Sequence, residues 1–361
     1  ADLPKRWLKG PTDPAGALVE LSDRPLLCMS VCVAADEVVV GGSDHALYTL
    51  DLSSGRKRRT LFTQRQGHTE WVTCVAHVGA DGSGGIVSGG MDSKLCLWQS
   101  KGVRCRDLLG HTGSVSCVGA TGSGSQVISG AYDRTVRVWD VRTAAEVACL
   151  RGHSGPVLEM AMGPGLVVTG GRDGLGIAWD LETGAALTEM RGHKGHITGV
   201  AWFGDDACNV FLTGAQDGHV RVWDLRSKSE VANVAAHTSD AGSGAVGCIE
   251  STTASKAAAM GGDVVVTAGA DAAVAVLEPR SGFTVGHKFT EHKDFIYSLY
   301  TAGTMCFSGA GDGMLLAHDL VERRVKWGIG ANAAAVRCIG GSAEHIVASG
   351  DDGNALVFPF V

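Results

Sequence analysis

An aspartate recurs in the same short frame along nearly the whole chain, and this periodicity constrains the fold more than any other feature. Over residues 126–141 the frame reads QVISGAYDRTVRVWDV, in which a β-branched run, a turn carrying Asp133 and a second run follow one another. The matching aspartates are Asp44, Asp92, Asp133, Asp173, Asp217, Asp271, Asp312 and Asp352. They span 308 residues, so the seven intervals average 44 residues. A repeat of this length predicts stacked supersecondary units rather than separate domains.

Each repeat has the pattern of a small antiparallel sheet. The runs at 114–120, 126–131 and 135–141 are short, alternating and β-branched, and a fourth follows at 146–150. Gly, Ser and Asp, which are turn residues, separate them. A lone sheet of this kind cannot bury both faces, whereas sheets stacked in a ring bury each other and leave only short edges.

Four repeats also share a polar pattern: a His before the first strand, a Ser or Thr in the second, the turn Asp, and a Trp in the third. This pattern resembles the WD40 repeat, one blade of a β-propeller. The four sets are His68, Ser88, Asp92 and Trp98; His111, Ser129, Asp133 and Trp139; His153, Thr169, Asp173 and Trp179; and His193, Thr213, Asp217 and Trp223. The resemblance implies that each set forms a structural hydrogen-bonded tetrad. We prefer this to a catalytic triad because the pattern recurs, whereas an active site occurs once.

The resemblance implies an all-β fold over residues 1–361, a single propeller of eight four-stranded blades, with the commoner seven as the alternative. The expected blades are residues 26–62, 67–109, 110–151, 152–191, 192–235, 236–290, 291–330 and 331–361. The chain ends before blade 8 has a fourth strand, and WD40 rings commonly close with a strand from the N-terminal end. Because Leu8 lies three residues before Pro11, as Leu150 does before His153, we predict that residues 5–9 pair with 354–360. Residues 11–25 are then an inserted loop.

Blades 1, 6, 7 and 8 depart from the full pattern. Blade 1 has no clear His and carries Leu50 at the Trp position. Blade 6 has Leu277 there, with small-residue insertions at 238–245 and 255–262, and blade 7 has His318. Blade 8 has Asn332 at the His position and Phe358 at the Trp position.

Composition disfavours several function classes. The net charge of −7 and a single basic run, residues 56–59, disfavour a nucleic-acid partner. No long apolar run suggests a membrane span. Eleven Cys, an odd number without a CxxC motif, indicate free thiols, mostly buried, in a reducing compartment. We therefore expect a cytoplasmic protein, with a cytoskeletal or ciliary setting as a hypothesis.

No motif indicates catalysis. The Gly-rich pieces 79–85 and 122–125 lack the Gly-Lys-Ser/Thr of a phosphate loop, and no nucleophile elbow or HExxH occurs. His193 and His196 lie three residues apart, but the tetrad already uses His193. We predict no enzyme activity, cofactor, metal or small-molecule substrate.

The resemblance marks one mouth of the ring as the partner-binding surface. Its contact positions flank the first apolar residue of each first strand and precede each turn aspartate. Transferred to this sequence, the partner-binding rim is Trp71, Met91, Tyr132, Arg172, His196, Gln216, Phe295, Tyr297, Arg337 and Asp351. The smaller or apolar residues Thr73, Ser114, Ser116, Pro156, Leu158 and Thr198 occupy equivalent positions. Blade 6 offers only Ala245, Gly247 and Ala270.

Three functions follow in order of preference. The first is a scaffold that docks a protein or peptide on this rim as a subunit of a larger assembly. The second is a substrate-receptor domain for a modification or degradation complex, which would favour an Arg-rich rim. The third is a propeller that binds nucleic acid or phosphoinositide through residues 56–59.

Overall fold

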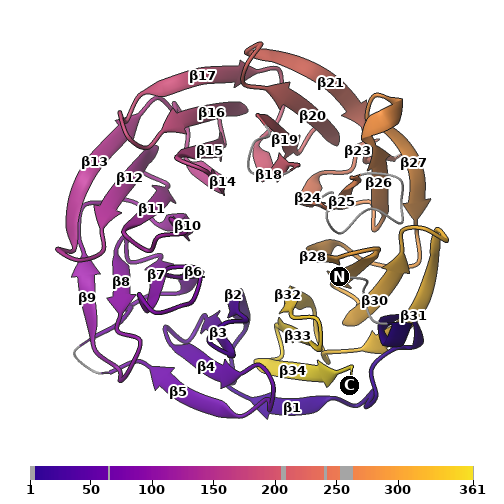
Figure 1. Ribbon diagram of the computed structural model, residues 1–361, viewed down its shortest axis with the longest axis horizontal. Coiled ribbons are helices and arrows are strands. Elements are labelled where there is room, and N and C mark those ends of the chain that lie inside the picture. The colour runs from indigo at the N-terminus through magenta and orange to yellow at the C-terminus, as the bar shows by residue number, and fades with distance from the viewer. Residues whose placement is uncertain (1–4, 64–65, 205–208, 240–241, 253–262, 361) are drawn as a thin grey trace.

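Eight four-stranded antiparallel sheets surround a central channel, as the computed structural model shows (Figure 1). The structure describes residues 5–63, 66–204, 209–239, 242–252 and 263–360. The prediction of an eight-bladed all-β propeller is confirmed, and the alternative of seven blades is wrong. None of the helical segments in the described ranges is long and apolar enough to cross a bilayer.

In each of the first four blades the strands follow one another outward from the channel. Blade 1 is β2 (Leu26–Cys32), β3 (Glu37–Gly42), β4 (Leu47–Asp51) and β5 (Lys57–Leu61). Blade 2 is β6 (Val72–His77), β7 (Ile86–Gly90), β8 (Leu95–Trp98) and β9 (Cys105–Leu108). Blade 3 is β10 (Val115–Ala120), β11 (Gln126–Ala131), β12 (Thr135–Asp140) and β13 (Ala145–Arg151). Blade 4 is β14 (Val157–Gly163), β15 (Leu166–Gly171), β16 (Leu175–Asp180) and β17 (Ala186–Arg191).

The next three blades follow the same order, and blade 8 takes its outer strand from the other end of the chain. Blade 5 is β18 (Ile197–Phe203), β19 (Val210–Ala215), β20 (His219–Asp224) and β21 (Ser229–Ala235). Blade 6 is β24 (Val246–Ser251), β25 (Val265–Gly269), β26 (Val274–Glu278) and β27 (Thr284–Phe289), after a hairpin of β22 (Thr238–Ser239) and β23 (Gly242–Ser243). Blade 7 is β28 (Ile296–Ala302), β29 (Met305–Ala310), β30 (Met314–Asp319) and β31 (Arg324–Gly330). Blade 8 is β32 (Val336–Gly341), β33 (His345–Gly350), β34 (Asn354–Pro359) and β1 (Ala17–Glu20).

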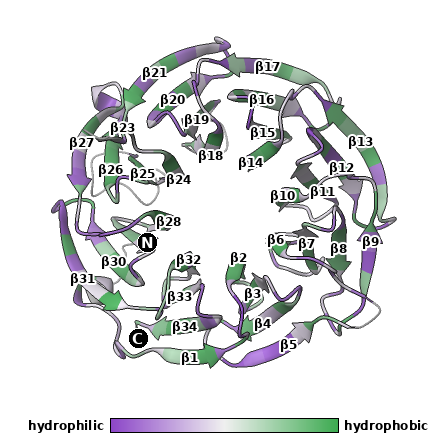
Figure 2. Ribbon diagram, turned by 180° about the vertical axis from the view of Figure 1, so that it is seen from behind, coloured by the Kyte–Doolittle hydropathy of each residue, from purple (hydrophilic) through white to green (hydrophobic). Residues whose placement is uncertain are grey.

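The hydrophobic core lies between neighbouring blades. Trp139 and Val127 of blade 3 pack with Val87 and Leu95 of blade 2 in one cluster. The second strands are buried along almost their whole length, since a blade covers each of their faces. Figure 2 shows the consequence: hydrophobic residues gather on the inner strands, and hydrophilic ones on outer strands such as β5 and β27. Each blade therefore depends on its two neighbours for its core.

The ring closes as expected at the N-terminal end, but the prediction that residues 5–9 form the closing strand is wrong. The closing strand is β1, in which Ala17 pairs with Val357 and Leu18 with Leu356. This also corrects the interpretation of residues 11–25 as an inserted loop. Residues 5–9 instead form a 3₁₀ turn, η1 (Lys5–Lys9).

The physical reason for this difference is the position of Trp7. Its side chain is fully buried, stacks on Phe360 with ring centroids 4.9 Å apart, and contacts Phe307 at the same distance. Its indole Nε1 donates to the carbonyl of Ala343 at 2.7 Å. In return, Trp327 Nε1 donates to the carbonyl oxygen of Trp7 at 2.8 Å. Trp7 therefore fills the junction between blades 7 and 8, and the chain reaches the blade 8 edge only ten residues later.

The second insertion predicted in blade 6, residues 255–262, lies outside the described residues. The first, residues 238–245, contains the β22–β23 hairpin, which pairs Thr238 with Ser243.

We expect Trp7→Ala to lower the free energy of unfolding by about 3–5 kcal/mol, because it removes a large buried side chain and an indole hydrogen bond. Chemical denaturation followed by fluorescence measures this, with the partly exposed neighbour Leu8→Ala as the control. Equal stability of the two variants would contradict the role of Trp7 in closing the ring.

Candidate partner-binding rim and its support

The four predicted tetrads are present, and each links the second and third strands of one blade, the turn between them and the loop before the first strand. In blade 3, His111 Nδ1 lies 2.9 Å from Asp133 Oδ2, and His111 Nε2 lies 2.8 Å from Ser129 Oγ. Trp139 Nε1 donates to the same hydroxyl at 2.9 Å. A neutral imidazole protonated on Nδ1 satisfies every contact, since it donates to Asp133 and accepts from Ser129. The same connections occur in blades 2, 4 and 5.

The protonation states agree with a structural network. Burial lowers the pKa of the His111 imidazole, although Asp133 raises it, so the ring is neutral at pH 7. Burial raises the pKa of the Asp133 carboxyl, but hydrogen bonds from Thr135, His111 and the Thr112 backbone outweigh it and keep the pKa below its usual range. Asp133 thus remains an ionised acceptor that joins the His111 loop to the β11–β12 turn.

The incomplete blades replace the tetrad in different ways. In blade 7, His318 takes the role of Trp, with its Nε2 2.6 Å from Ser308 Oγ, so that set is complete. In blade 8, Asn332 Nδ2 donates to Asp352 at 2.7 Å. In blade 1 the position of the missing His is taken by Ser22, whose hydroxyl donates to Asp44 at 2.5 Å. Sequence spacing contained this information, because Ser22 lies four residues before Leu26, as His153 does before Val157.

The rim is built by a β-bulge that recurs in every blade. In blade 2 the register shifts between Val72 and Cys74, and the first strands of the other seven blades shift at the equivalent place. A bulge of this kind redirects the extra side chain. The residue before each turn aspartate then bonds back across the blade, as when Met91 N–H donates to the carbonyl of Trp71 at 2.9 Å. The corresponding bonds are Tyr132 to Ser114, Arg172 to Pro156, Gln216 to His196 and Asp351 to Ala335.

On blades 2 and 3 the rim is exposed and apolar. The exposed fractions are 47% for Trp71, 45% for Met91 and 48% for Tyr132. Backbone bonds connect them, and Ser114 Oγ donates to the carbonyl of Met91 at 3.4 Å, which joins the two blades. On the next blade Arg172 is exposed, and its Nε donates to His196 Nε2 at 3.4 Å. Within the described part of the chain, no carboxylate forms an ion pair with Arg172.

On blades 7 and 8 the rim residues are bonded to one another. The rings of Phe295 and Tyr297 lie 4.7 Å apart, and the Arg337 guanidinium lies 4.0 Å from the centroid of Tyr297. Arg337 also donates twice to Asp351, at 2.8 Å each. A Cβ on Gly247 would lie 3.1 Å from the Phe295 ring, so Phe295 covers the small-residue position of blade 6. The small residues of blade 6 predict a gap in the rim or cover by the insertions of that blade, and the sequence contained no signal for cover by Phe295.

Three smaller rim residues connect neighbouring blades. Ser116 Oγ donates to the carbonyl of Val157 in the next blade at 2.6 Å. Thr73 and Thr198 make the same bond to Val115 and Val246, at 2.5 Å each. These hydroxyls therefore support the ring, and a partner contact at the same positions stays a prediction.

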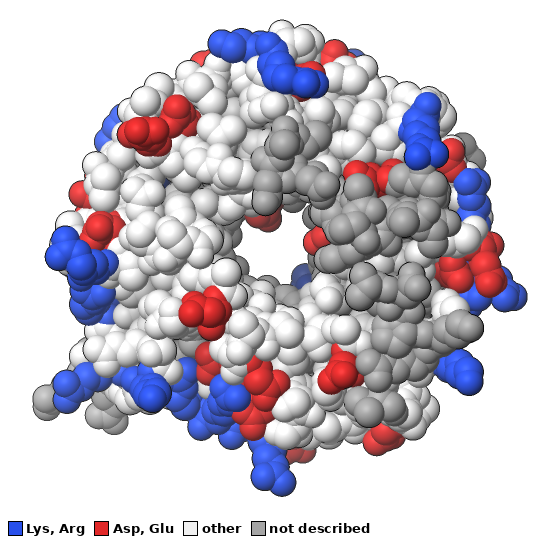
Figure 3. Space-filling model, viewed as in Figure 1, with Lys and Arg blue, Asp and Glu red and all other residues white. Residues whose placement is uncertain are grey.

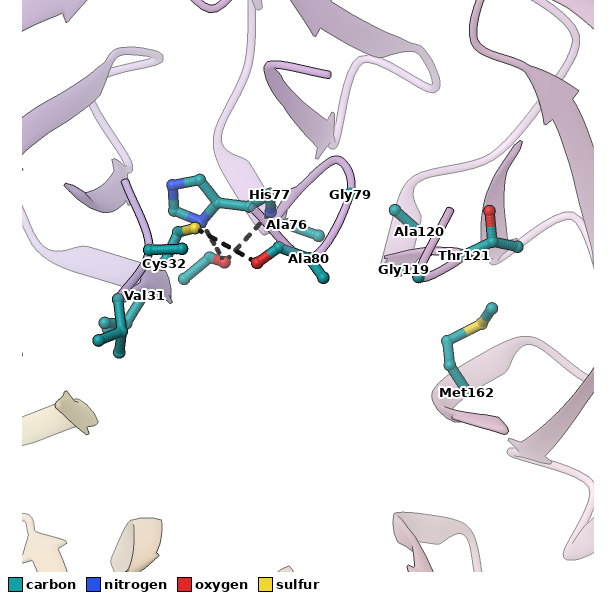
Figure 4. A pocket seen from close by; sticks show the side chains of 14 residues that line it. Val31, Cys32, Ala76, His77, Gly79, Ala80, Gly119, Ala120, Thr121 and Met162 are labelled. Atoms are coloured by element: carbon teal, nitrogen blue, oxygen red, sulfur yellow. Dashed lines mark hydrogen bonds between the residues drawn. The ribbon is translucent and has the colours of Figure 1, made fainter. Parts of the chain in front are cut away.

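The opposite mouth of the channel has a hollow of about 800 Å³ at the carboxyl ends of the first strands of blades 1 to 4. Figure 4 shows His77 and Cys32 on one side of it and Met162 on the other. His77 Nδ1 lies 2.9 Å from Ser30 Oγ, and Cys32 Sγ donates to the carbonyl of Ala80 at 3.9 Å. The remaining lining is mostly Gly, Ala and Val. Ser30 and His77 are thus a hydroxyl and an imidazole in hydrogen-bond contact, and the second ring nitrogen of His77, Nε2, lies 3.6 Å from Glu37 Oε2.

Two of the four residues of the basic run, Arg58 and Arg59, are paired with carboxylates, whereas Arg56 and Lys57 are exposed. Arg59 donates to Glu37 at 2.8 Å and to the carbonyls of residues 99, 100 and 102. Arg58 forms an ion pair with Asp51. Figure 3 shows that charged side chains on the face in view gather mainly at the outer edge, and that the described surface to the left of the channel is mostly uncharged. These observations disfavour a polyanion partner at residues 56–59.

We expect Asp133→Ala to lower the free energy of unfolding by about 1–3 kcal/mol, because buried donors at His111 and Thr135 lose their acceptor. Thermal unfolding measures this against Glu182→Ala, an exposed acidic residue. Unchanged thermal stability of Asp133→Ala would argue against a structural tetrad.

Stability should also depend on pH through Glu159, which stands in blade 4 where blades 1, 2 and 3 have Cys. Burial raises the pKa of the Glu159 carboxyl to about 7. The folded state then binds this proton more tightly than the unfolded state, so stability is lost as pH rises from about 4.5 to 7. We expect Glu159→Gln to be up to about 3 kcal/mol more stable than the parent at pH 8, and equally stable near pH 4.5. Denaturant titrations across this range test it, and a pH-independent difference, or one matched by Glu182→Gln, would contradict it.

The comparisons with known proteins agree with this architecture. The family described as "WD domain, G-beta repeat" matches residues 57–99, 102–140 and 184–224. Autophagy-related protein 16 of Arabidopsis thaliana is 30% identical over 137 residues, 38% of this chain and 26% of that protein. Nuclear distribution protein PAC1 of Arthroderma otae is 29% identical over 171 residues, 45% of this chain and 36% of that protein. This chain therefore spans well under half the length of these relatives.

Among solved structures, the crystal structure of the computationally designed Ika8 protein superposes with a TM-score of 0.78 at 22% identity, covering 94% of this chain and 98% of that one. That similarity concerns the fold alone. The three matched segments show that this chain carries WD40 repeats, and the eight observed blades show that they belong to an eight-bladed β-propeller.

Proposed function

We propose that this propeller is a non-enzymatic scaffold that docks a protein or peptide on the rim of blades 2 to 4, as a subunit of a larger assembly. WD40 propellers are in general interaction scaffolds, and fold alone does not specify the partner. The proposal therefore depends on the side chains of the rim.

The observation that carries the proposal is the exposed apolar surface of Trp71, Met91 and Tyr132. These three side chains lie on two adjacent blades and are joined through the backbone bonds of the rim. The inter-blade core is complete without them, since it is formed by residues such as Val72, Val115 and Trp139. Large aromatic side chains on a rigid surface are the usual centres of binding energy in protein interfaces. A partner segment with apolar side chains fits this surface.

Arg172 extends the surface with a positive charge. Its Nε donates to Nε2 of His196, and no carboxylate in the described chain forms an ion pair with it. Arg337, the other rim arginine, is held by Asp351 and Tyr297. A single available arginine supports an apolar segment followed by one acidic residue. It supports the multiply phosphorylated ligand of a substrate receptor less well, because such a ligand needs several basic side chains.

The setting of the assembly is part of the proposal. We retain a cytoplasmic location, with a cytoskeletal or ciliary complex as one candidate. Autophagy and nuclear distribution, the processes named in two relatives, are others. A nucleic-acid or phosphoinositide partner is the less favoured alternative, because two residues of the basic run, Arg58 and Arg59, are paired with Asp51 and Glu37.

We expect Trp71→Ala and Tyr132→Ala each to weaken partner binding by about 1–3 kcal/mol without changing the thermal stability of the ring. The measurement is quantitative capture of partners from source lysate, followed by affinity measurements with the identified partner. Val147→Ala is the matched control, because Val147 is 57% exposed but lies on the outer strand β13.

Arg172→Gln should weaken binding of the same partner and make the affinity for that partner less dependent on salt concentration. If partner affinities are the same for the parent, Trp71→Ala and Tyr132→Ala, the rim assignment is wrong. If salt-sensitive binding follows residues 56–59 instead, the nucleic-acid or phosphoinositide alternative replaces it.

A further inference from the structure

Blade 2 differs from blades 3 and 5 in a pair of side chains that face each other on its two outermost strands, β8 and β9. In blade 3 this pair is an ion pair between Arg137 of β12 and Glu146 of β13, and in blade 5 the equivalent pair is Arg221 and Glu230. The register identifies the equivalent residues in blade 2. Glu146 pairs with Trp139 across the strands, and Cys105 pairs with Trp98 in the same way. Cys96 then stands where Arg137 stands, so blade 2 has two thiols in place of an ion pair.

A carboxylate completes this group of side chains. Asp107 lies directly across from Cys96, and its Oδ1 is 3.6 Å from Cys96 Sγ and 3.8 Å from Cys105 Sγ. Lys94 donates to the other oxygen, Oδ2, at 2.9 Å. Lys94 thereby holds the carboxylate with Oδ1 toward both sulfurs. The three possible ligand atoms all lie within 4.8 Å of one another.

Two thiolates and a carboxylate are a donor set for a thiophilic divalent cation. Tetrahedral Zn²⁺ with Zn–S bonds of about 2.3 Å needs its sulfurs about 3.8 Å apart, so the observed spacing requires only a small closure. The charges also match. The two thiolates and the Asp107 carboxylate are negative and Lys94 is positive, so the net local charge equals that of one divalent cation with the opposite sign. Asp107 is exposed and Cys105 half-buried, which leaves room for water as the fourth ligand.

We propose that Cys96, Cys105 and Asp107 form a zinc-type metal site that holds β9 to β8. Blade 2 lacks a device that blade 3 has at its outer hairpin. There Asp140 accepts from the backbone and hydroxyl of Thr143, at 2.7 Å each, and closes the turn. Blade 2 has Gln99 at that position, and its turn is closed by a backbone bond from Gln99 to Arg104. A metal that bridges β8 and β9 binds the folded state and not the unfolded chain, so it stabilises this short outer strand.

A disulfide between Cys96 and Cys105 is the competing possibility. Such a bond needs an oxidant and no carboxylate, whereas here Oδ1 of Asp107 points at both sulfurs. The cation is therefore the better explanation of all three side chains, and the disulfide is an outcome that the experiment must detect.

The test is a titration of the reduced, metal-free full chain with Zn²⁺ against a chromophoric chelator, and with Co²⁺ by absorption. We expect one equivalent of Zn²⁺ to bind, Co²⁺ to give the near-ultraviolet band of thiolate ligation, and the thermal midpoint to rise with free Zn²⁺. Cys105→Ser and Asp107→Asn should each weaken Zn²⁺ binding at least about tenfold.

Cys149→Ser is the matched control, because Cys149 occupies in blade 3 the register position of Asp107 and is a half-buried thiol. This variant should bind Zn²⁺ like the parent, and metal-free Cys105→Ser should unfold like the metal-free parent. The proposal is overturned if the reduced parent binds no Zn²⁺, if Cys105→Ser binds it unchanged, or if peptide mapping of non-reduced protein finds a Cys96–Cys105 disulfide and no metal. None of these outcomes depends on whether a partner binds the rim.

Discussion

The mutual burial of neighbouring blades is the constraint on which the rest of this structure depends. A four-stranded blade has two apolar faces, and each face is covered only by the next blade in the ring. The ring therefore has to close, because a poor fit at the junction between the first and last blades would leave apolar surface of both blades exposed to water. Here β1 completes blade 8 while Trp7 fills the space beside blade 7. Two separate parts of the N-terminal segment thus solve the pairing and the packing problems.

The polar sets solve a different problem, because tight turns leave backbone groups in need of partners. An ionised aspartate in the turn accepts from a loop histidine and from backbone N–H groups, as Asp133 does with His111 and Thr112. Where the hydroxyl is lost, the indole is lost with it: blade 1 has Val40 and Leu50 at these two positions, and Ser22 bonds the retained Asp44. Blade 8 likewise has Ala348 and Phe358 at these two positions, and Asn332 bonds its turn aspartate, Asp352. Loss of the hydroxyl and the indole together therefore leaves fewer buried polar groups without a partner than loss of one of them alone.

The same local geometry makes the rim available for recognition. A bulge at each first strand and a backbone bond from each second strand place pairs of side chains at one mouth of the channel. What those side chains do depends on their neighbours. Trp71 and Tyr132 remain exposed, whereas Tyr297 and Arg337 are engaged with each other and with Asp351. Two halves of one rim therefore differ in the exposure and pairing of their side chains although their backbones are equivalent.

Local sequence determined the blade architecture, the eight repeats, the four tetrads and the set of rim positions. All of these follow from residues close together within one repeat, where spacing and residue type carry the signal. The closing strand was within reach too, since Ser22 has the spacing of the missing His, but the similarity of residues 5–9 to a fourth strand was misleading.

Only the tertiary structure decided which pairs across blades or strands act together. The stack of Phe295, Tyr297 and Arg337, the cover of Phe295 over Gly247, and the approach of Cys96, Cys105 and Asp107 depend on register and on the packing between blades. Such contacts leave no periodic pattern in a single sequence, because the free energy that selects them comes from neighbours that are distant along the chain.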